Sequence, residues 1–144
     1  MKCLIVEDDF ISRRILRELL GAYFDCEIAV DGEEAVTAFK MAHDAKTPYD
    51  LICMDIMMPK MDGREALRLV RKLEKELEVP PNLEVKVVMT TALDDPKTVF
   101  DSFYQDGATA YLVKPISKQK LLRELRALGL RSEEHTSELQ SLAY

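Results

Sequence analysis

The sequence predicts an α/β protein built around a doubly wound parallel sheet. Short apolar runs alternate five times with segments whose apolar residues recur at helical spacing. The first run is apolar almost throughout, as expected for a strand that is buried on both faces. Strands that alternate with helices form parallel sheets covered by helices, and right-handed crossovers leave few topologies for such a chain.

Five runs are expected to form the strands. Each is short and is followed by a turn signal or by a residue that suits the start of a helix. In chain order the runs are Lys2–Val6, Phe24–Val30, Asp50–Met54, Glu84–Thr90 and Thr109–Val113.

The first helix is expected over Phe10–Leu20. Its apolar side chains recur at the spacing of one helical face, which predicts that this face packs against the sheet. Gly21 follows directly and can end the helix. The residues of this predicted face are Ile11, Ile15, Leu16, Leu19 and Leu20.

The other four helices are predicted from their capping residues. Two have a capping box, in which an N-cap Asp is followed three residues later by Glu. A third begins with Pro at its favoured first position, and the last begins after a serine. The starts and approximate ends are Asp31 to His43 and Asp62 to Glu78 for the two boxes, Asp95-Pro96 for the start of the next helix, and Ser117 to Leu128 for the last.

These five β-α units favour a flavodoxin-like sheet with strand order 2-1-3-4-5. Composition agrees, because 47% of residues are apolar and 32% are charged, which is typical of a globular domain. The formal net charge of -6 argues against direct nucleic-acid binding, which depends on clustered Lys and Arg. No apolar stretch is long enough to span a membrane, so a cytoplasmic location is expected.

The cysteines and the C-terminal segment lead to two further predictions. Cys3, Cys26 and Cys53 lie in strand-like runs without metal-ligand spacing, so three buried, reduced thiols are expected. Residues 131–141 read RSEEHTSELQS, which looks like the translation of a DNA-sequencing adapter. We therefore expect a single domain over 1–130 and treat 131–144 as an adapter-derived tail outside the fold.

Polar residues follow four of the predicted strands. Ligands bind at the carboxyl ends of strands in such sheets, next to the point where strand order reverses. The first and third strands flank that point, so their carboxylates should converge there with the lysine and the threonines. In strand order the residues are Glu7, Asp8 and Asp9, then Asp55, then Thr90 and Thr91, then Lys114.

Clustered carboxylates repel one another unless a cation neutralises them, and Mg²⁺ prefers oxygen ligands together with a phosphate. Asp8 and Asp55 can ligate the ion directly, a backbone carbonyl just past Asp55 can add a ligand, and Glu7 can hold a metal-bound water. Lys114 supplies a positive charge for a phosphoryl oxygen. A carboxylate is a competent nucleophile for phosphoryl transfer, which requires mainly in-line positioning and charge neutralisation.

Taken singly, these residues also have ordinary structural explanations. The acids after the first strand suit a helix N-terminus, and Asp9 is expected to be the cap itself. Asp55 can be a turn residue, Thr91 an ordinary strand hydroxyl and Lys114 a surface residue. The functional interpretation depends on all four strand ends carrying the required chemistry together.

The same residues resemble the response-regulator receiver family of two-component signalling, over about 2–129. LIVEDD (Leu4–Asp9) resembles the family's acidic pocket, and MDIMMPKMDG (Met54–Gly63) resembles its phosphoacceptor motif. TTA (Thr90–Ala92) and YLVKP (Tyr111–Pro115) follow in the family's order. The stand-alone, CheY-like members are the most similar in length.

The resemblance implies a role for each matching residue. Asp55 is the phosphoacceptor, and Glu7, Asp8, Asp55 and the backbone carbonyl of Met57 form the site for Mg²⁺ or Mn²⁺. Thr91 and Lys114 bind the phosphoryl group, and Thr91 and Tyr111 form the switch. The implied readout surface comprises the fourth helix, the fifth strand and the fifth helix, with Val99, Phe103, Tyr111, Lys118 and Lys120.

The resemblance also implies a signalling switch that catalyses its own phosphorylation and dephosphorylation and is not a conventional enzyme. A sensor histidine kinase or a phosphotransfer protein would supply the phosphoryl group, and a downstream protein would bind the phosphorylated form. A second copy of this chain, in a phosphorylation-dependent homodimer, is a further candidate partner. Nucleic acid and membrane are not expected as direct partners.

Three alternative interpretations require residues or properties that differ from those of this sequence. A degenerate receiver would act only as an interaction module, but Asp8, Asp55 and Lys114 are all present. A haloacid-dehalogenase-type phosphatase needs a second Asp two residues after its nucleophile, where Met57 stands. A flavin or nucleotide module needs a phosphate-binding loop after the first strand, where the acids would repel the phosphate.

Overall fold

The computed structural model describes residues 1–92 and 96–130, without the side chains of 96 and 102–104. The predicted cap Asp95, the side chain of Phe103 and the proposed tail 131–144 lie outside the described residues. The chain divides into two compact units, Met1–Lys114 and Pro115–Tyr144, and each has its own structure.

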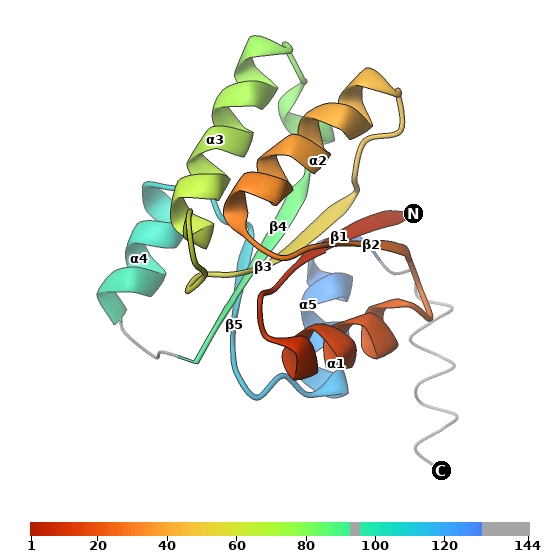
Figure 1. Ribbon diagram of the computed structural model, residues 1–144, viewed down its shortest axis with the longest axis vertical. Helices are drawn as coiled ribbons and strands as arrows, with labels where there is room; N and C mark the ends of the chain where they lie inside the picture. The colour runs from red at the N-terminus through yellow and green to blue at the C-terminus, as the bar shows by residue number, and fades with distance from the viewer. Residues whose placement is uncertain (93–95, 131–144) are drawn as a thin grey trace. The chain divides into compact units, whose positions relative to one another are not determined.

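The sheet lies in the first unit and has the predicted topology. Its five parallel strands are ordered β2-β1-β3-β4-β5, which confirms the flavodoxin-like α/β class (Figure 1). β2 lies at an edge, and its burial alternates along the strand because an edge strand is only partly covered. The strands are β1 (Lys2–Val6), β2 (Asp25–Ala29), β3 (Leu51–Asp55), β4 (Lys86–Thr91) and β5 (Ala110–Val113).

The helices begin and end close to the predicted residues. The first unit contains α1 (Phe10–Leu20), α2 (Gly32–Asp44), α3 (Gly63–Glu76), a short 3-10 helix η1 (Pro81–Leu83) and α4 (Pro96–Tyr104). The second unit contains α5 (Lys118–Ala127).

Four predicted N-caps are confirmed. The side chains of Asp9, Asp31 and Asp62 each accept a hydrogen bond from the backbone N–H three residues on, at 2.9 Å. Ser117 does the same for α5 at 3.1 Å. Each bond satisfies a backbone donor that the helix leaves unpaired in its first turn, which explains why the helices start where they do.

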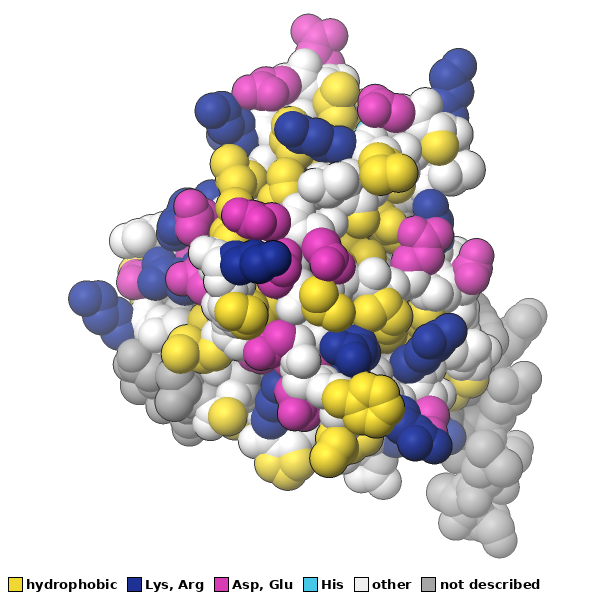
Figure 2. All heavy atoms as spheres, in the orientation of Figure 1, with side chains coloured by type: hydrophobic (Ala, Val, Ile, Leu, Met, Phe, Trp, Pro, Cys, Tyr) yellow, Lys and Arg dark blue, Asp and Glu magenta, His cyan; other side chains and the backbone are white. Residues whose placement is uncertain are grey.

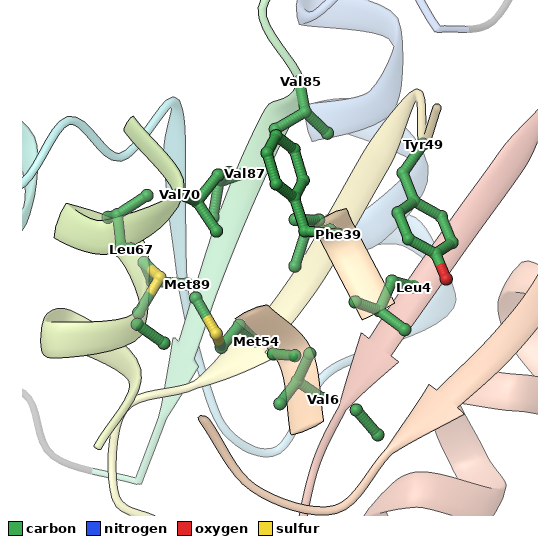
Figure 3. Close-up of a cluster of buried hydrophobic side chains, with 14 of the residues drawn as sticks. Leu4, Val6, Phe39, Tyr49, Met54, Leu67, Val70, Val85, Val87 and Met89 are labelled. Carbon is green, nitrogen blue, oxygen red and sulfur yellow. The ribbon is translucent and has the colours of Figure 1, made fainter. Parts of the chain in front are cut away.

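The main core lies between the sheet and helices α2 and α3 (Figure 3). Leu4, Val6, Met54 and Met89 point from the strands toward Phe39 of α2, and toward the apolar face of α3. All five side chains are fully buried. Burial of each such side chain contributes about 1.5 to 3 kcal/mol, so this layer fixes the strands whose carboxyl ends carry the acidic residues.

The apolar face of α1 differs from the prediction. Leu16 and Leu20 are buried, but Ile11 and Ile15 are 67% and 46% exposed, together with Phe10 at 64%. The helix therefore buries a narrower stripe than its sequence pattern suggests. Phe10 also borders a groove along α1 that is lined mainly by arginines, and the space-filling view shows yellow and dark blue side chains mixed on this part of the surface (Figure 2).

The cysteine prediction is wrong for one residue. All three thiols are free, and Cys3 and Cys53 are buried, but Cys26 is partly exposed because it lies on the edge strand β2. Among the described residues, no helix is both long enough and apolar enough to cross a membrane.

Candidate functional site

Hydrogen bonds that continue the sheet link the carboxyl ends of neighbouring strands. The N–H of Glu7 donates to the carbonyl of Ala29 at 3.1 Å, and the N–H of Ile56 donates to Thr90 at 2.9 Å. The N–H of Lys114 donates to the carbonyl of Thr91 at 2.7 Å. Because these bonds fix the first residue beyond each strand, the polar side chains at that edge have defined positions.

Three carboxylates converge at this edge, as the sequence predicts. Val6 pairs with Met54 in the register of β1 and β3, which places Glu7 beside Asp55. Carboxylate oxygens of Glu7, Asp8 and Asp55 all lie within 4.8 Å of one another. Glu7 is fully buried and Asp55 is 6% exposed, whereas Asp8 faces solvent. This oxygen-rich group fits a hard divalent cation, which favours carboxylate ligands and retains some of its water.

Lys114 is the basic residue of the site. Its ammonium group donates a short hydrogen bond to Oε1 of Glu7 and lies 3.5 Å from Oδ2 of Asp55. The second oxygen of Glu7 accepts from the N–H of Asp9 at 3.3 Å, so the buried carboxylate has partners on both oxygens. Two buried carboxylates therefore share a single lysine, and the solvent-facing Asp8 adds a third negative charge.

The pKa values of Glu7 and Lys114 are both shifted by the charges of this site. Burial raises the pKa of Glu7, the hydrogen bond from Lys114 opposes this, and the neighbouring charge of Asp55 raises it further. Burial would lower the pKa of Lys114, but the hydrogen bond with Glu7 and the charge of Asp55 outweigh burial and hold that pKa above its usual value. The protein thus keeps a charged lysine beside carboxylates that are incompletely neutralised.

The loop after Asp55 requires Gly63, a residue whose role is not evident from the sequence alone. The N–H of Gly63 donates to the carbonyl of Ile56 at 2.8 Å, which closes the loop. A Cβ at position 63 would lie 2.1 Å from the carbonyl oxygen of Asp55. A side chain at this position would therefore displace the backbone of Asp55, and only glycine permits the observed approach.

A second unforeseen residue is Arg13 of α1. Its guanidinium donates to the backbone carbonyl of Glu7 at 3.1 Å. The contact ties the first turns of α1 to the end of β1, one residue before Asp8. A charged residue in the exposed part of a helix gives no sequence signal for such a contact.

The remaining predicted residues occupy three different environments. Thr91 is fully buried at the end of β4, and Tyr111 is half-buried and packs against the main core. Thr90 lies opposite Asp55 in the register of β3 and β4. The side chain of Met57 is 61% exposed, so any contribution of this residue to the site must come from its backbone.

Comparison with known proteins places this site in a family. Residues 3–126 match the model of the response regulator receiver domain. The chain belongs to the response regulator receiver family. Its membership makes it a receiver domain of two-component signalling, and the acidic group at the sheet edge is the pocket of that domain.

Two curated relatives and one solved structure illustrate the similarity. The probable transcriptional regulator ycf27 of Cyanophora paradoxa is 35% identical over 136 residues, which is 94% of this chain and 51% of the relative. The chain thus spans about half the length of that protein. The chemotaxis protein CheY of Treponema pallidum is 35% identical over 130 residues, which cover 88% of this chain and 81% of CheY.

The solved structure is the CheX-CheY-BeF3-Mg+2 complex from Borrelia burgdorferi. Its matching chain is 28% identical, with a TM-score of 0.78, and the match covers 91% of this chain and 90% of that one. The similarity therefore extends over the fold of nearly the whole receiver domain.

Proposed function

We propose that this receiver domain accepts a phosphoryl group on Asp55 in a reaction that requires a divalent cation, and that it acts as a phosphorylation-controlled switch. The observation that carries the proposal is the convergence of Glu7, Asp8 and Asp55 within 4.8 Å of one another, beside the ammonium group of Lys114. One lysine for three carboxylates leaves negative charge that a cation would neutralise.

Mg²⁺ or Mn²⁺ would be held by Asp8, Asp55 and the backbone carbonyl of Met57, with Glu7 holding a metal-bound water. The donor set fits, because all of these ligands are oxygens and Asp8 is open to solvent. The Borrelia CheY relative is described as a complex with BeF3 and Mg+2, which supports the same type of ion here. When bound, the cation would neutralise charge on the phosphoryl oxygens.

The reaction is a transfer from nitrogen to oxygen. A carboxylate oxygen of Asp55 attacks phosphorus on the phosphohistidine of a sensor kinase or phosphotransfer protein. The new O–P bond forms as the N–P bond breaks, and the electron pair of that bond returns to the imidazole. Lys114, whose ammonium group lies 3.5 Å from Asp55, is placed to pair with a phosphoryl oxygen, and Thr91 would donate a hydrogen bond to another.

The switch would follow from the added charge. A phosphoryl group brings three acceptor oxygens, toward which Thr91 and Lys114 can move. Movement of Thr91 would free space that Tyr111 can fill, and this would bias an existing equilibrium between two conformations. In the first unit, Val99 of α4 and Tyr111 of β5 would belong to the readout surface.

The partners we propose are proteins. The phosphoryl donor would dock where it can reach Asp55, and the exposed side chains of Phe10 and Ile11 on α1 follow directly after the acidic residues. We propose a cytoplasmic regulator whose receiver domain, residues 1–130, binds a downstream protein rather than nucleic acid. The formal net charge of -6 supports the last point.

The test is intact-mass spectrometry after incubation with acetyl phosphate and Mg²⁺. The wild type should gain one phosphoryl group, and Asp55→Asn or EDTA should abolish the gain. Asp50→Asn is the matched control, because Asp50 is an exposed carboxylate at the opposite end of β3 and should leave the adduct unchanged. A folded wild type without an adduct would favour the degenerate receiver, and an adduct on Asp55→Asn would mean that another residue is the nucleophile.

A further inference from the structure

Two cysteines face each other at the end of the sheet remote from the acidic pocket. Cys3 of β1 and Cys26 of β2 are direct partners in the register of these parallel strands, which lie side by side in Figure 1. Partners in a parallel pair project from the same face of the sheet. Adjacent strands lie about 4.8 Å apart, so the two thiols are neighbours.

The two thiols have different environments. Cys3 is fully buried, whereas Cys26 is partly exposed on the edge strand. The neighbouring thiol of Cys3 lowers the pKa of Cys26, burial opposes this, and the charge of Arg17 lowers it further. The neighbouring thiol of Cys26 and burial raise the pKa of Cys3. Cys26 is therefore the accessible thiol with the greater thiolate character, and Cys3 is a protonated thiol beside it.

We propose that Cys26 and Cys3 form a redox-sensitive pair that a hydroperoxide converts to a disulfide. The thiolate of Cys26 attacks the peroxide, so that an S–O bond forms, the O–O bond breaks and the leaving oxygen takes up a proton. The sulfur of Cys3 then attacks the sulfur of Cys26, an S–S bond replaces the S–O bond, and the proton of Cys3 leaves with the hydroxide as water. Two thiols are oxidised and one hydrogen peroxide is reduced to two waters.

Backbone geometry permits this bond. Neighbouring strands lie about 4.8 Å apart, and disulfides join Cα atoms that are about 4.4 to 6.8 Å apart. Cys53 is an unsuitable partner for Cys26 because it lies on β3, with β1 between the two strands. The disulfide would join β1 to the edge strand β2 and close a loop that contains α1 and the acids after β1.

The test exposes the reduced full chain to hydrogen peroxide and maps the tryptic peptides without reduction. We expect one species that has lost two hydrogen atoms and in which the peptide of residues 3–13 is linked to that of residues 18–40. Cys53→Ser is the matched control and should give the same linked peptide. In Cys3→Ser, a sulfenic acid should accumulate on Cys26 and react with dimedone.

The wild-type map decides the question even where a variant fails to fold. The proposal is overturned if the peptide of residues 18–40 remains a free thiol under conditions that oxidise free cysteine, or if the disulfide formed contains Cys53. It is equally overturned if Cys26→Ser still yields the same loss of two hydrogen atoms. These outcomes are independent of phosphorylation at Asp55, because no phosphoryl donor is present.

Discussion

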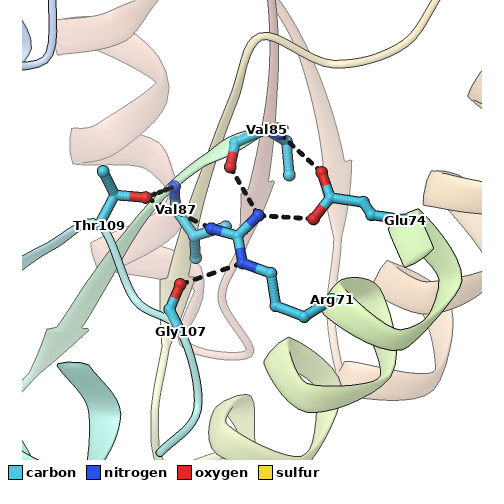
Figure 4. A network of polar contacts seen from close by, with 6 residues as sticks. All are labelled: Arg71, Glu74, Val85, Val87, Gly107 and Thr109. Carbon is cyan, nitrogen blue, oxygen red and sulfur yellow. Dashed lines mark hydrogen bonds and ion pairs between the residues drawn. The ribbon is translucent and has the colours of Figure 1, made fainter. Parts of the chain in front are cut away.

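Two of the buried groups of charged residues in the first unit are balanced in opposite ways. Arg71 and Glu74 of α3 form an ion pair at 2.7 Å, in which every carboxylate oxygen has a donor (Figure 4). Oε2 of Glu74 accepts from the N–H of Val85 at 2.7 Å. Arg71 also donates to the carbonyls of Val85 and Gly107, at 2.9 and 3.0 Å.

At the carboxyl edge of the sheet, one lysine serves two buried carboxylates and a third carboxylate lies beside them. The Arg71 group is thus neutral and fully hydrogen-bonded without any ligand, whereas the Glu7 group carries an excess of negative charge that a cation would neutralise. A satisfied buried network stabilises the fold, and an unsatisfied one indicates a binding site. The comparison predicts that substitutions in the first group alter stability, whereas substitutions in the second alter ligand binding.

The largest expected effect is that of Arg71→Met. This variant retains most of the aliphatic stem but leaves the carboxylate of Glu74, which is 1% exposed, without its ion-pair partner. Removing one member of a buried pair costs about 3 to 5 kcal/mol of unfolding free energy. Urea denaturation measures the loss.

Arg68→Met is the matched control for this prediction. Arg68 lies on the same helix and pairs with Asp106 at 2.9 Å, but its side chain is 51% exposed and Asp106 also binds Arg64. We expect a loss below about 1 kcal/mol. Equal losses in the two variants would show that the Arg71 network has no special role in stability.

Replacing threonine by valine should have opposite effects on stability at Thr109 and Thr90. The hydroxyl of Thr109 accepts from the N–H of Val87 at 3.0 Å, so Thr109→Val leaves a buried donor unpaired and should cost about 1 to 3 kcal/mol. In the described part of the chain, the buried hydroxyl of Thr90 has no hydrogen-bond partner. Thr90→Val should therefore raise stability by about 1 kcal/mol. Thermal or urea unfolding measures both, and destabilisation by Thr90→Val would reveal an interaction of that hydroxyl in solution.

Mg²⁺ should stabilise the domain through its acidic pocket. At ten times its dissociation constant, a ligand that binds the native state adds about 1.4 kcal/mol of unfolding free energy. Asp8→Asn should remove this increment without unfolding the protein, because Asp8 is exposed. Asp50→Asn should retain it. The measurement is urea denaturation with and without Mg²⁺, and the same increment in Asp8→Asn would place the ion elsewhere.

The smallest expected effect is the pH dependence contributed by Glu7. Folding raises its pKa above the ordinary value of 4.5, so the folded state retains the proton to higher pH than the unfolded state. In EDTA, stability should therefore fall as pH rises from about 4.5 through the raised pKa, and then level off. Glu7→Gln should lack this decline. A stability difference between the two proteins that is constant across this pH range would contradict the assignment.

Most of the fold could be predicted because its signals are local. The apolar runs and the residues Asp9, Asp31, Asp62 and Ser117 determine where strands and helices begin. Burial depends on tertiary contacts, and this is why the exposure of Ile11 and Ile15 and the partial exposure of Cys26 were not predicted. The pattern of a helix face does not specify how much of that face its neighbours cover.

The acidic pocket could be predicted because each of its residues follows a strand of a sheet with known topology. The buried contacts that hold the surrounding structure in place could not be predicted from the sequence. Arg71 and Glu74 resemble an ordinary solvated pair on a charged helix, and only the structure shows that Glu74 is buried. The requirement for Gly63 follows from a 2.1 Å approach to Asp55, which is a three-dimensional fact.

The central claim is that Asp55 receives the phosphoryl group, and borohydride trapping tests it most directly. Borohydride reduces an aspartyl phosphate to homoserine, which mass spectrometry locates within the tryptic peptide of residues 47–60. That peptide also contains Asp50, an internal control of the same residue type. Our account predicts homoserine at position 55, dependent on Mg²⁺ and acetyl phosphate. Homoserine at position 50, or at Asp8 or Asp9 with position 55 unchanged, would contradict it.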